Sequence, residues 1–294
     1  MSIPFLRDDP LPHGAVEHVL PLVRRIVCAN PGPFTFRGTN TYLIGRGEVA
    51  VLDPGPEDAA RLAAILRATE GERITRILVS HTHRDHSPGA AALMAATGAT
   101  SHGFGPHLTP HDAGGEGGDH GFRPQVTLAD GDVVEGSAWR VTALHTPGHC
   151  ANHLCFALET AEGAGVLFSA DHVMSWSTTV VGPPDGDMAD YMASLARIAA
   201  RDDRLYLPGH GPKLPDPGPF VAALAAHRLE REAKVLAALR RARRATATEL
   251  VPAVYGPELD SRLMGGAARS LLAHLIKLAA EGAAIRDGES FEPR

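Results

Sequence analysis

The sequence predicts an α/β protein followed by a smaller, mainly helical module. Up to about residue 216, short β-branched runs alternate with helical runs, and Gly/Pro turns separate them. Several candidate strands end in loops rich in histidine and aspartate, as expected where a site lies at strand ends. After Pro215-Asp216-Pro217 the pattern changes to long helices. We therefore expect one domain over residues 1–216 and a second over 217–294.

The elements expected in the first domain follow one another in a regular order. Residues 49–52 form an apolar run that ends at Asp53-Pro54-Gly55, so they predict a buried strand. Residues 102–124 lack periodicity and predict a loop of unusual length. The remaining candidates are strands over 74–80, 139–144, 153–158, 165–169 and 204–207, and helices over 57–70 and 88–97.

The second domain is predicted to contain three helices and a β-ribbon. The helices are expected over 218–243, 246–255 and 260–281, and the ribbon over 284–291 with an Asp287-Gly288 turn. This order is typical of a winged-helix-like module. Residues 218–294 carry a net charge of +3, whereas residues 1–217 carry −9.

Composition excludes several classes of protein. The chain has 294 residues, 44% of them hydrophobic, and a net charge of −6, which disfavours a protein that coats nucleic acid. Three cysteines are too few for a disulfide framework. No apolar run approaches the roughly 20 residues that span a bilayer, and the N-terminus lacks the apolar core of a signal peptide. We expect a cytoplasmic protein with no membrane partner. The sequence does not indicate an oligomeric state.

The strongest chemical motif is Ser80-His81-Thr82-His83-Arg84-Asp85-His86, directly after the predicted strand 74–80. Side chains alternate in direction along extended backbone, so His81 and His83 can converge if the extended chain continues past Ser80. Neutral imidazole and carboxylate suit zinc or iron. The density of these side chains after a buried strand favours a metal site over a solvated polar loop.

Three further strand ends deliver ligand types. His149 follows a Pro-Gly turn after strand 139–144, with His145 and His153 as alternative ligands at that place. Asp171 ends the apolar strand 165–169, and His210 follows strand 204–207 in a Pro-Gly-His-Gly motif. Each of these is weak alone, but four strand ends that each supply a ligand form a strong pattern. We expect His102, His107, His111 and His120 to be surface loop residues.

With these motifs, the sequence resembles the metallo-β-lactamase-fold superfamily over about residues 16–215. The resemblance implies an αββα sandwich with a dinuclear metal site, usually zinc. It places His81, His83 and His149 on one metal ion and Asp85, His86 and His210 on the other, with Asp171 bridging. Asp53 would support the site from behind the ligands. His145 and His172 match no ligand position in the superfamily.

The motif from Asn30 to Tyr42 and the C-terminal module together resemble the beta-lactamase-like protein 2 group. Two Zn²⁺ ions, or iron or manganese, would share a water of lowered pKa, and the resulting hydroxide would be the nucleophile of a hydrolase. Asp85 could accept or relay a proton through its second oxygen, which makes it the catalytic candidate. Esters, thioesters, lactones and RNA phosphodiesters all suit such a site, so the substrate is a small molecule or RNA.

Two other functions compete with hydrolysis. The same ligands could hold iron for redox chemistry. Alternatively, the C-terminal module could be a nucleic-acid-binding regulator, since Arg240, Arg241, Arg243 and Arg244 cluster at the end of the long helix. A solvated helix end, where cations suit the helix dipole, is the simpler explanation of that cluster.

Overall fold

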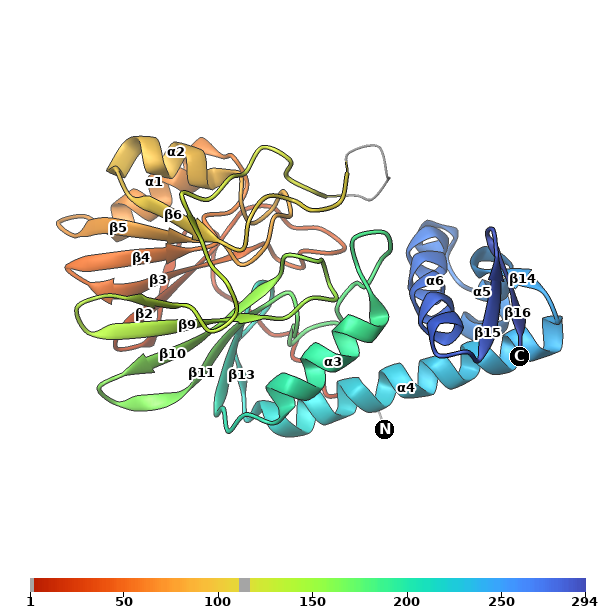
Figure 1. The fold of residues 1–294 in the computed structure, drawn as a ribbon. Coiled ribbons are helices and arrows are strands. Elements are labelled where there is room, and N and C mark those ends of the chain that lie inside the picture. The colour runs from red at the N-terminus through yellow and green to blue at the C-terminus, as the bar shows by residue number, and fades with distance from the viewer. Residues whose placement is uncertain (1–2, 111–116) are drawn as a thin grey trace.

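Two β-sheets packed face to face, with helices on both outer faces, form the larger part of the molecule (Figure 1). The computed structural model describes residues 3–110 and 117–294. The layers run from α1 and α2 through the first and second sheets to α3 and the first part of α4. This is the predicted αββα sandwich. The three helices that belong wholly to it are α1 (Ala59–Ala68), α2 (Gly89–Thr97) and α3 (Met188–Ala199).

The first sheet has seven strands in sequence order. Strands β1 to β4 pair antiparallel, and β4 to β7 pair parallel. In β4 every residue from Val49 to Leu52 is buried, because the second sheet covers one face and helices cover the other. The strands are β1 (Val16–Leu20), β2 (Val23–Val27), β3 (Asn40–Arg46), β4 (Glu48–Leu52), β5 (Arg73–Leu78), β6 (Thr100–Gly103) and β7 (Val126–Thr127).

The second sheet has six strands in the order β13-β12-β11-β10-β9-β8. Strands β11 and β12 pair parallel, and the other neighbours pair antiparallel. Side chains of both sheets meet in one core, where the rings of Tyr42 and Phe168 lie 5.1 Å apart. The strands are β8 (Val133–Glu135), β9 (Trp139–His145), β10 (Leu154–Thr160), β11 (Gly163–Ala170), β12 (Leu205–Pro208) and β13 (Leu214–Pro215).

The long helix α4 (Pro217–Ala242) belongs to two cores. Its first turns, with Phe220 and Leu224, pack beneath the second sheet, whereas Val235 and Leu239 pack against α5, α6 and the C-terminal ribbon. The predicted division at residues 216 and 217 therefore falls just before a helix that joins both parts, and it stays a prediction. The module contains β14 (Ala245–Thr246), α5 (Ala247–Tyr255), a 3-10 turn (Ser261–Leu263), α6 (Met264–Ala280), β15 (Ala284–Asp287) and β16 (Ser290–Pro293).

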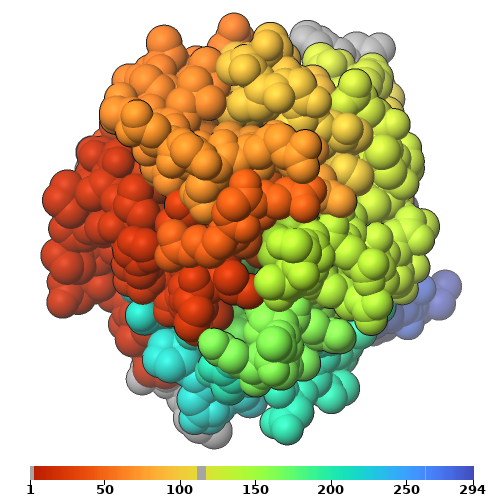
Figure 2. Space-filling model, turned by 90° about the vertical axis from the view of Figure 1, so that its left-hand side faces the viewer, coloured from red at the N-terminus to blue at the C-terminus, as the bar shows by residue number. Residues whose placement is uncertain are grey.

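The module stands beside one end of the sandwich (Figure 1). Figure 2 views the opposite end, where residues in red and orange from the first part of the chain border residues in green from its middle, and the blue C-terminal residues are visible only at the margin. Among residues 3–110 and 117–294, no helix is long and apolar enough to cross a membrane.

We did not predict the N-terminal strands β1 to β3 or helix α3 from the sequence. In β2, Arg24 and Arg25 interrupt the apolar pattern, yet both are buried. Each is paired with a carboxylate 2.6 Å away, Arg24 with Glu72 and Arg25 with Asp9. The predicted strand 74–80 was also too long, because β5 ends at Leu78. His81 and His83 therefore converge from a loop rather than from a continued strand.

The C-terminal ribbon offers a test of the module's core. Phe291 is fully buried, whereas Ile285 on the neighbouring strand is 47% exposed. We expect Phe291→Ala to lower the free energy of unfolding by about 3–5 kcal/mol, because it leaves a cavity among α4, α6 and the ribbon. Ile285→Ala should change it by no more than about 0.5 kcal/mol. Urea unfolding followed by circular dichroism measures both, and equal losses would contradict this packing.

Candidate metal centre

Seven histidine and aspartate side chains meet where strands of both sheets end. His81, His83, Asp85 and His86 follow β5, and the others are supplied after β9, β11 and β12. The loops that carry them gather at the end of the sandwich that faces α6 (Figure 1). The structure thus brings together every predicted ligand, of which the last three are His149, Asp171 and His210.

Three imidazoles form the first donor group. His83 Nδ1 lies 3.0 Å from His81 Nε2 and 3.0 Å from His149 Nε2. Zinc–nitrogen bonds of 2.0–2.1 Å in a tetrahedral site place the nitrogens about 3.3 Å apart. The three nitrogens therefore fit one small divalent cation with little movement.

Asp85, His86 and His210 form the second donor group. Asp85 Oδ2 lies 3.3 Å from His86 Nε2 and 3.1 Å from His210 Nε2. Asp171 lies between the two groups, since its Oδ2 is 3.3 Å from His210 Nε2 and 3.7 Å from His149 Nε2. Its Oδ1 is 3.6 Å from His86 Nε2. One carboxylate is thus in reach of both groups, which is the arrangement of a shared ligand.

Two donor atoms of this cluster are buried without a hydrogen-bond partner among the described residues. They are His86 Nε2 and Asp171 Oδ1. A buried polar atom left unpaired costs free energy, so native proteins satisfy nearly all of them. A cation within the cluster would satisfy both atoms.

Hydrogen bonds on the outer side of the cluster orient the donors. Asp53 accepts from Ser80 N at 2.8 Å and from Ser80 Oγ at 2.7 Å, and its Oδ2 lies 3.0 Å from His86 Nδ1. His149 Nδ1 lies 2.7 Å from the Val180 carbonyl oxygen. An Nδ1–H that donates outward leaves Nε2 free to bind metal.

Small residues allow this close approach. A side chain at Gly209, in the Pro-Gly-His-Gly motif, would collide with Asp171 Oδ1. Asp53 and Ala170 adopt φ values of 52° and 42°, a region that favours glycine, at the ends of β4 and β11. The backbone is thus specially shaped beside the cluster.

The two donor groups differ in their electrostatics. Burial lowers the pKa of His81 well below its usual range and that of His149 to about 4, and neighbouring imidazoles add to this. Burial also opposes protonation of His86 and His210, but nearby carboxylates outweigh it. They raise the pKa of His86 well above its usual range and that of His210 to about 10. Without metal, the second group therefore holds protons that a cation would displace.

Asp185, a further carboxylate beside the cluster, was not predicted from the sequence. Asp185 Oδ2 lies 3.8 Å from His83 Nε2 and 3.8 Å from His107 Nε2. Burial opposes its ionisation, but the nearby imidazole of His83 and a hydrogen bond from Thr109 lower its pKa to about 2. In the sequence it sits in Pro183-Pro184-Asp185-Gly186, which is typical of a simple turn.

The interpretation of the loop histidines needs a correction. His107 was expected at the surface, but its side chain is only 6% exposed, and its Nδ1 lies 2.9 Å from Thr82 Oγ1. His102 lies in β6 and lines a separate surface hollow. The ring of His120 lies 4.8 Å from that of His107. His111 lies outside the described residues.

Cys150 is next to His149 in sequence and close to the cluster. Its Sγ is within reach of donor atoms of His83 and Asp185. Burial raises the pKa of its thiol well above the usual value, which disfavours the thiolate that binds metals. We therefore expect that Cys150 binds no metal.

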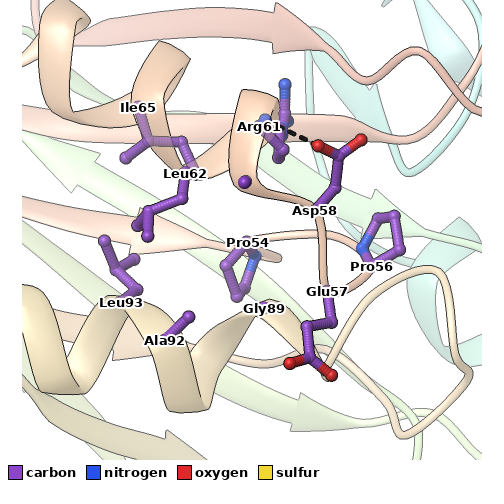
Figure 3. Close-up of a pocket in the computed structure, with 11 residues that line it drawn as sticks. Pro54, Pro56, Glu57, Asp58, Arg61, Leu62, Ile65, Gly89, Ala92 and Leu93 are labelled. Carbon is purple, nitrogen blue, oxygen red and sulfur yellow. Dashed lines mark hydrogen bonds between the residues drawn. The ribbon is translucent and has the colours of Figure 1, made fainter.

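One surface pocket lies away from this cluster. It has a volume of about 170 Å³ and lies between α1 and α2, lined largely by apolar side chains such as Leu62 and Leu93 (Figure 3). At its edge, Asp58 caps α1 by accepting hydrogen bonds from Ala60 N and Arg61 N. The residues that line this pocket include none of the seven donors, so it is separate from the candidate metal centre.

Comparison with known proteins agrees with this geometry. Residues 34–210 match the metallo-beta-lactamase superfamily. The chain belongs to this superfamily. Residues 246–292 match the beta-lactamase associated winged helix domain, which confirms the predicted module. The chain is therefore a hydrolase of the metallo-beta-lactamase superfamily, a class whose members usually bind divalent metals.

Several relatives are named as thioesterases. The chain is 31% identical over 288 residues to the atrochrysone carboxyl ACP thioesterase AgnL7 of Paecilomyces divaricatus, covering 94% of this chain and 84% of the relative. It is 33% identical to an atrochrysone carboxyl ACP thioesterase of Passalora fulva, covering 91% and 78%. A beta-lactamase domain protein from Burkholderia ambifaria has a similar structure, with a TM-score of 0.80, 26% identity and coverage of 99% and 97%.

The electrostatic difference between the donor groups predicts how metal binding depends on pH. His86 and His210 have raised pKa values, so they are protonated at neutral pH without metal and must lose protons to bind a cation. Affinity at the second group should therefore rise with pH between 6 and 9. His81 and His149 are already neutral, so the first group should release fewer protons.

Calorimetric titration of the metal-free protein with Zn²⁺, in two buffers of different ionisation enthalpy, counts the protons released at each step. We expect the second equivalent to release more protons than the first. Equal release at both steps would contradict the assignment of charge to the two groups.

Proposed function

We propose that the protein is a dinuclear zinc hydrolase of acyl thioesters. The observation that carries the proposal is the pair of donor groups that both lie beside Asp171, with His86 Nε2 and Asp171 Oδ1 lacking a hydrogen-bond partner in the part of the chain that the structure describes. The proposed ligands of one ion are His81, His83 and His149, and those of the other are Asp85, His86 and His210. Residues 1–216 would form the catalytic domain and 217–294 the C-terminal domain.

Two divalent cations held in these positions would lower the pKa of a shared water towards about 7 and polarise an acyl carbonyl oxygen. Asp53 would keep His86 in the tautomer that presents Nε2 to the metal. Asp171 would hold the two groups at a constant separation.

Asp85 is the candidate proton acceptor. Its Oδ2 accepts a hydrogen bond from Thr39 Oγ1 at 3.2 Å and faces the second group. Burial opposes its ionisation, but His86 and His210 lower its pKa well below the usual range, so it stays a carboxylate at neutral pH. One oxygen can ligate while the other takes a proton from the attacking water.

The leaving group favours thioesters over RNA. A thiolate with a pKa of about 8.5 departs without first receiving a proton, whereas the alkoxide of a phosphodiester needs a general acid. The net charge of −9 on residues 1–217 also opposes the binding of a long polyanion. The thioesterase names of the relatives support the same substrate class.

The test is hydrolysis of acetyl- and benzoyl-coenzyme A by zinc-loaded protein, measured by release of the free thiol. We expect chelation to abolish the activity and Zn²⁺ to restore it. His83→Ala should reduce kcat/KM by at least about 10³-fold, because it removes a proposed ligand. The matched control is His102→Ala, a histidine of β6 outside the cluster, which should retain activity.

Elemental analysis of the same protein identifies the metal. About two zinc ions per chain would support the proposal, and stoichiometric iron would favour redox chemistry instead. Full activity of metal-free protein, or cleavage of single-stranded RNA without thioester hydrolysis, would overturn the proposal.

A further inference from the structure

Arg228, on the helix that leads into the C-terminal module, reaches back into the sandwich. The residue is 5% exposed, and its Nη2 donates a hydrogen bond to the carbonyl oxygen of Thr179. Its guanidinium lies over the ring of Tyr191, 5.2 Å from the ring centroid. Among the described residues Arg228 makes no ion pair and its Nε is buried without a hydrogen-bond partner, so the carbonyl and the ring only partly compensate its charge.

The segment that Arg228 holds is in direct contact with the metal centre. Thr179 Oγ1 lies 2.8 Å from the carbonyl oxygen of Asp171 and 2.9 Å from that of His172. The next carbonyl, that of Val180, lies 2.7 Å from His149 Nδ1. Residues 179 and 180 therefore contact the backbone of one proposed ligand and the side chain of another. Tyr191 adds a second connection, since its hydroxyl donates to the His172 carbonyl at 3.3 Å.

We propose that Arg228 is a positioning residue for the metal centre. It acts through Thr179 and Val180, which fix the positions of His149 and Asp171. This inference rests on the proposed function, in which those two side chains are ligands. It means that helix α4, which leads into the winged-helix module, helps to build the site. The module is then a component of the metal centre and not only an appended domain.

The chemistry of Arg228 argues for this role over simple packing. Burying a guanidinium costs free energy, and an apolar side chain of similar volume is often as stable or more stable at such a position. An apolar side chain would leave the Thr179 carbonyl without its donor. The arginine thus fixes the Thr179 carbonyl, and the neighbouring Val180 carbonyl orients His149. Hydrogen bonds to the outer side of metal ligands commonly orient them in this way.

The experiment measures Zn²⁺ affinity by competition with a chromophoric chelator, on the full chain. Arg228→Met keeps an apolar side chain and removes the N–H groups that donate to the Thr179 carbonyl. Thr179→Val removes the hydroxyl that contacts the Asp171 and His172 carbonyls. Both should weaken Zn²⁺ binding about 10–100-fold. Thr179→Ser keeps the hydroxyl and should stay within about twofold of the wild type. The matched control Arg231→Met, which removes an arginine on the same helix that lies over Tyr255, should also stay within about twofold.

Cobalt substitution supplies a readout that a purely structural role would not change. The visible d–d bands of Co²⁺ should shift in Arg228→Met and Thr179→Val, and they should not shift in the two controls. If Arg228→Met does not fold, Arg228→Gln, whose shorter side chain withdraws the donor from the Thr179 carbonyl, replaces it in both measurements.

The outcomes separate the two proposals. Wild-type affinity and an unchanged cobalt spectrum in Arg228→Met and Thr179→Val, in a protein that binds two metal ions, would overturn the positioning role and leave the hydrolase proposal intact. A wild-type protein that binds no metal would overturn both.

Discussion

The carboxylate of Asp171 is the constraint on which the rest of the site depends. It is buried, one of its oxygens has no hydrogen-bond partner among the described residues, and it lies within 3.3–3.7 Å of histidines from both donor groups. A buried, incompletely paired anion is costly, so the surroundings must either neutralise it or supply cations. As imidazolium ions, the histidines around it can neutralise the carboxylate. As neutral ligands, they can instead bind the metal cations that would neutralise it.

The fold meets this constraint by bringing strand ends from two sheets to one place. The first sheet supplies the His81–His86 loop and the second supplies Asp171 and His210, so the donor side chains come together only when the two sheets are packed against each other. Stability of the sandwich core and geometry of the site are therefore coupled. Through Arg228 and Thr179, this coupling extends to α4 and so to the C-terminal module.

The sequence predicted most of this arrangement, because its strongest features are local. His81 to His86 are adjacent in the chain, and each of the other donors follows an apolar run that is readily identified as a strand. The contributions of Asp185 and Arg228 were not predictable, since each depends on a contact between residues far apart in the chain. Strand β2 was likewise not predicted, because Arg25 makes its sequence look exposed, and the pairing with Asp9 that allows this arginine to be buried cannot be seen in the sequence. His107 was misjudged for the same reason, because its burial follows from the loops that pack around it.

In the proposed centre, the carboxylate of Asp171 joins two metal positions. Anomalous diffraction at the zinc absorption edge, from crystals of the zinc-loaded protein, locates those positions. We expect two peaks, one among His81, His83 and His149 and the other among Asp85, His86 and His210, with Asp171 between them. A single peak, or peaks away from Asp171, would contradict it.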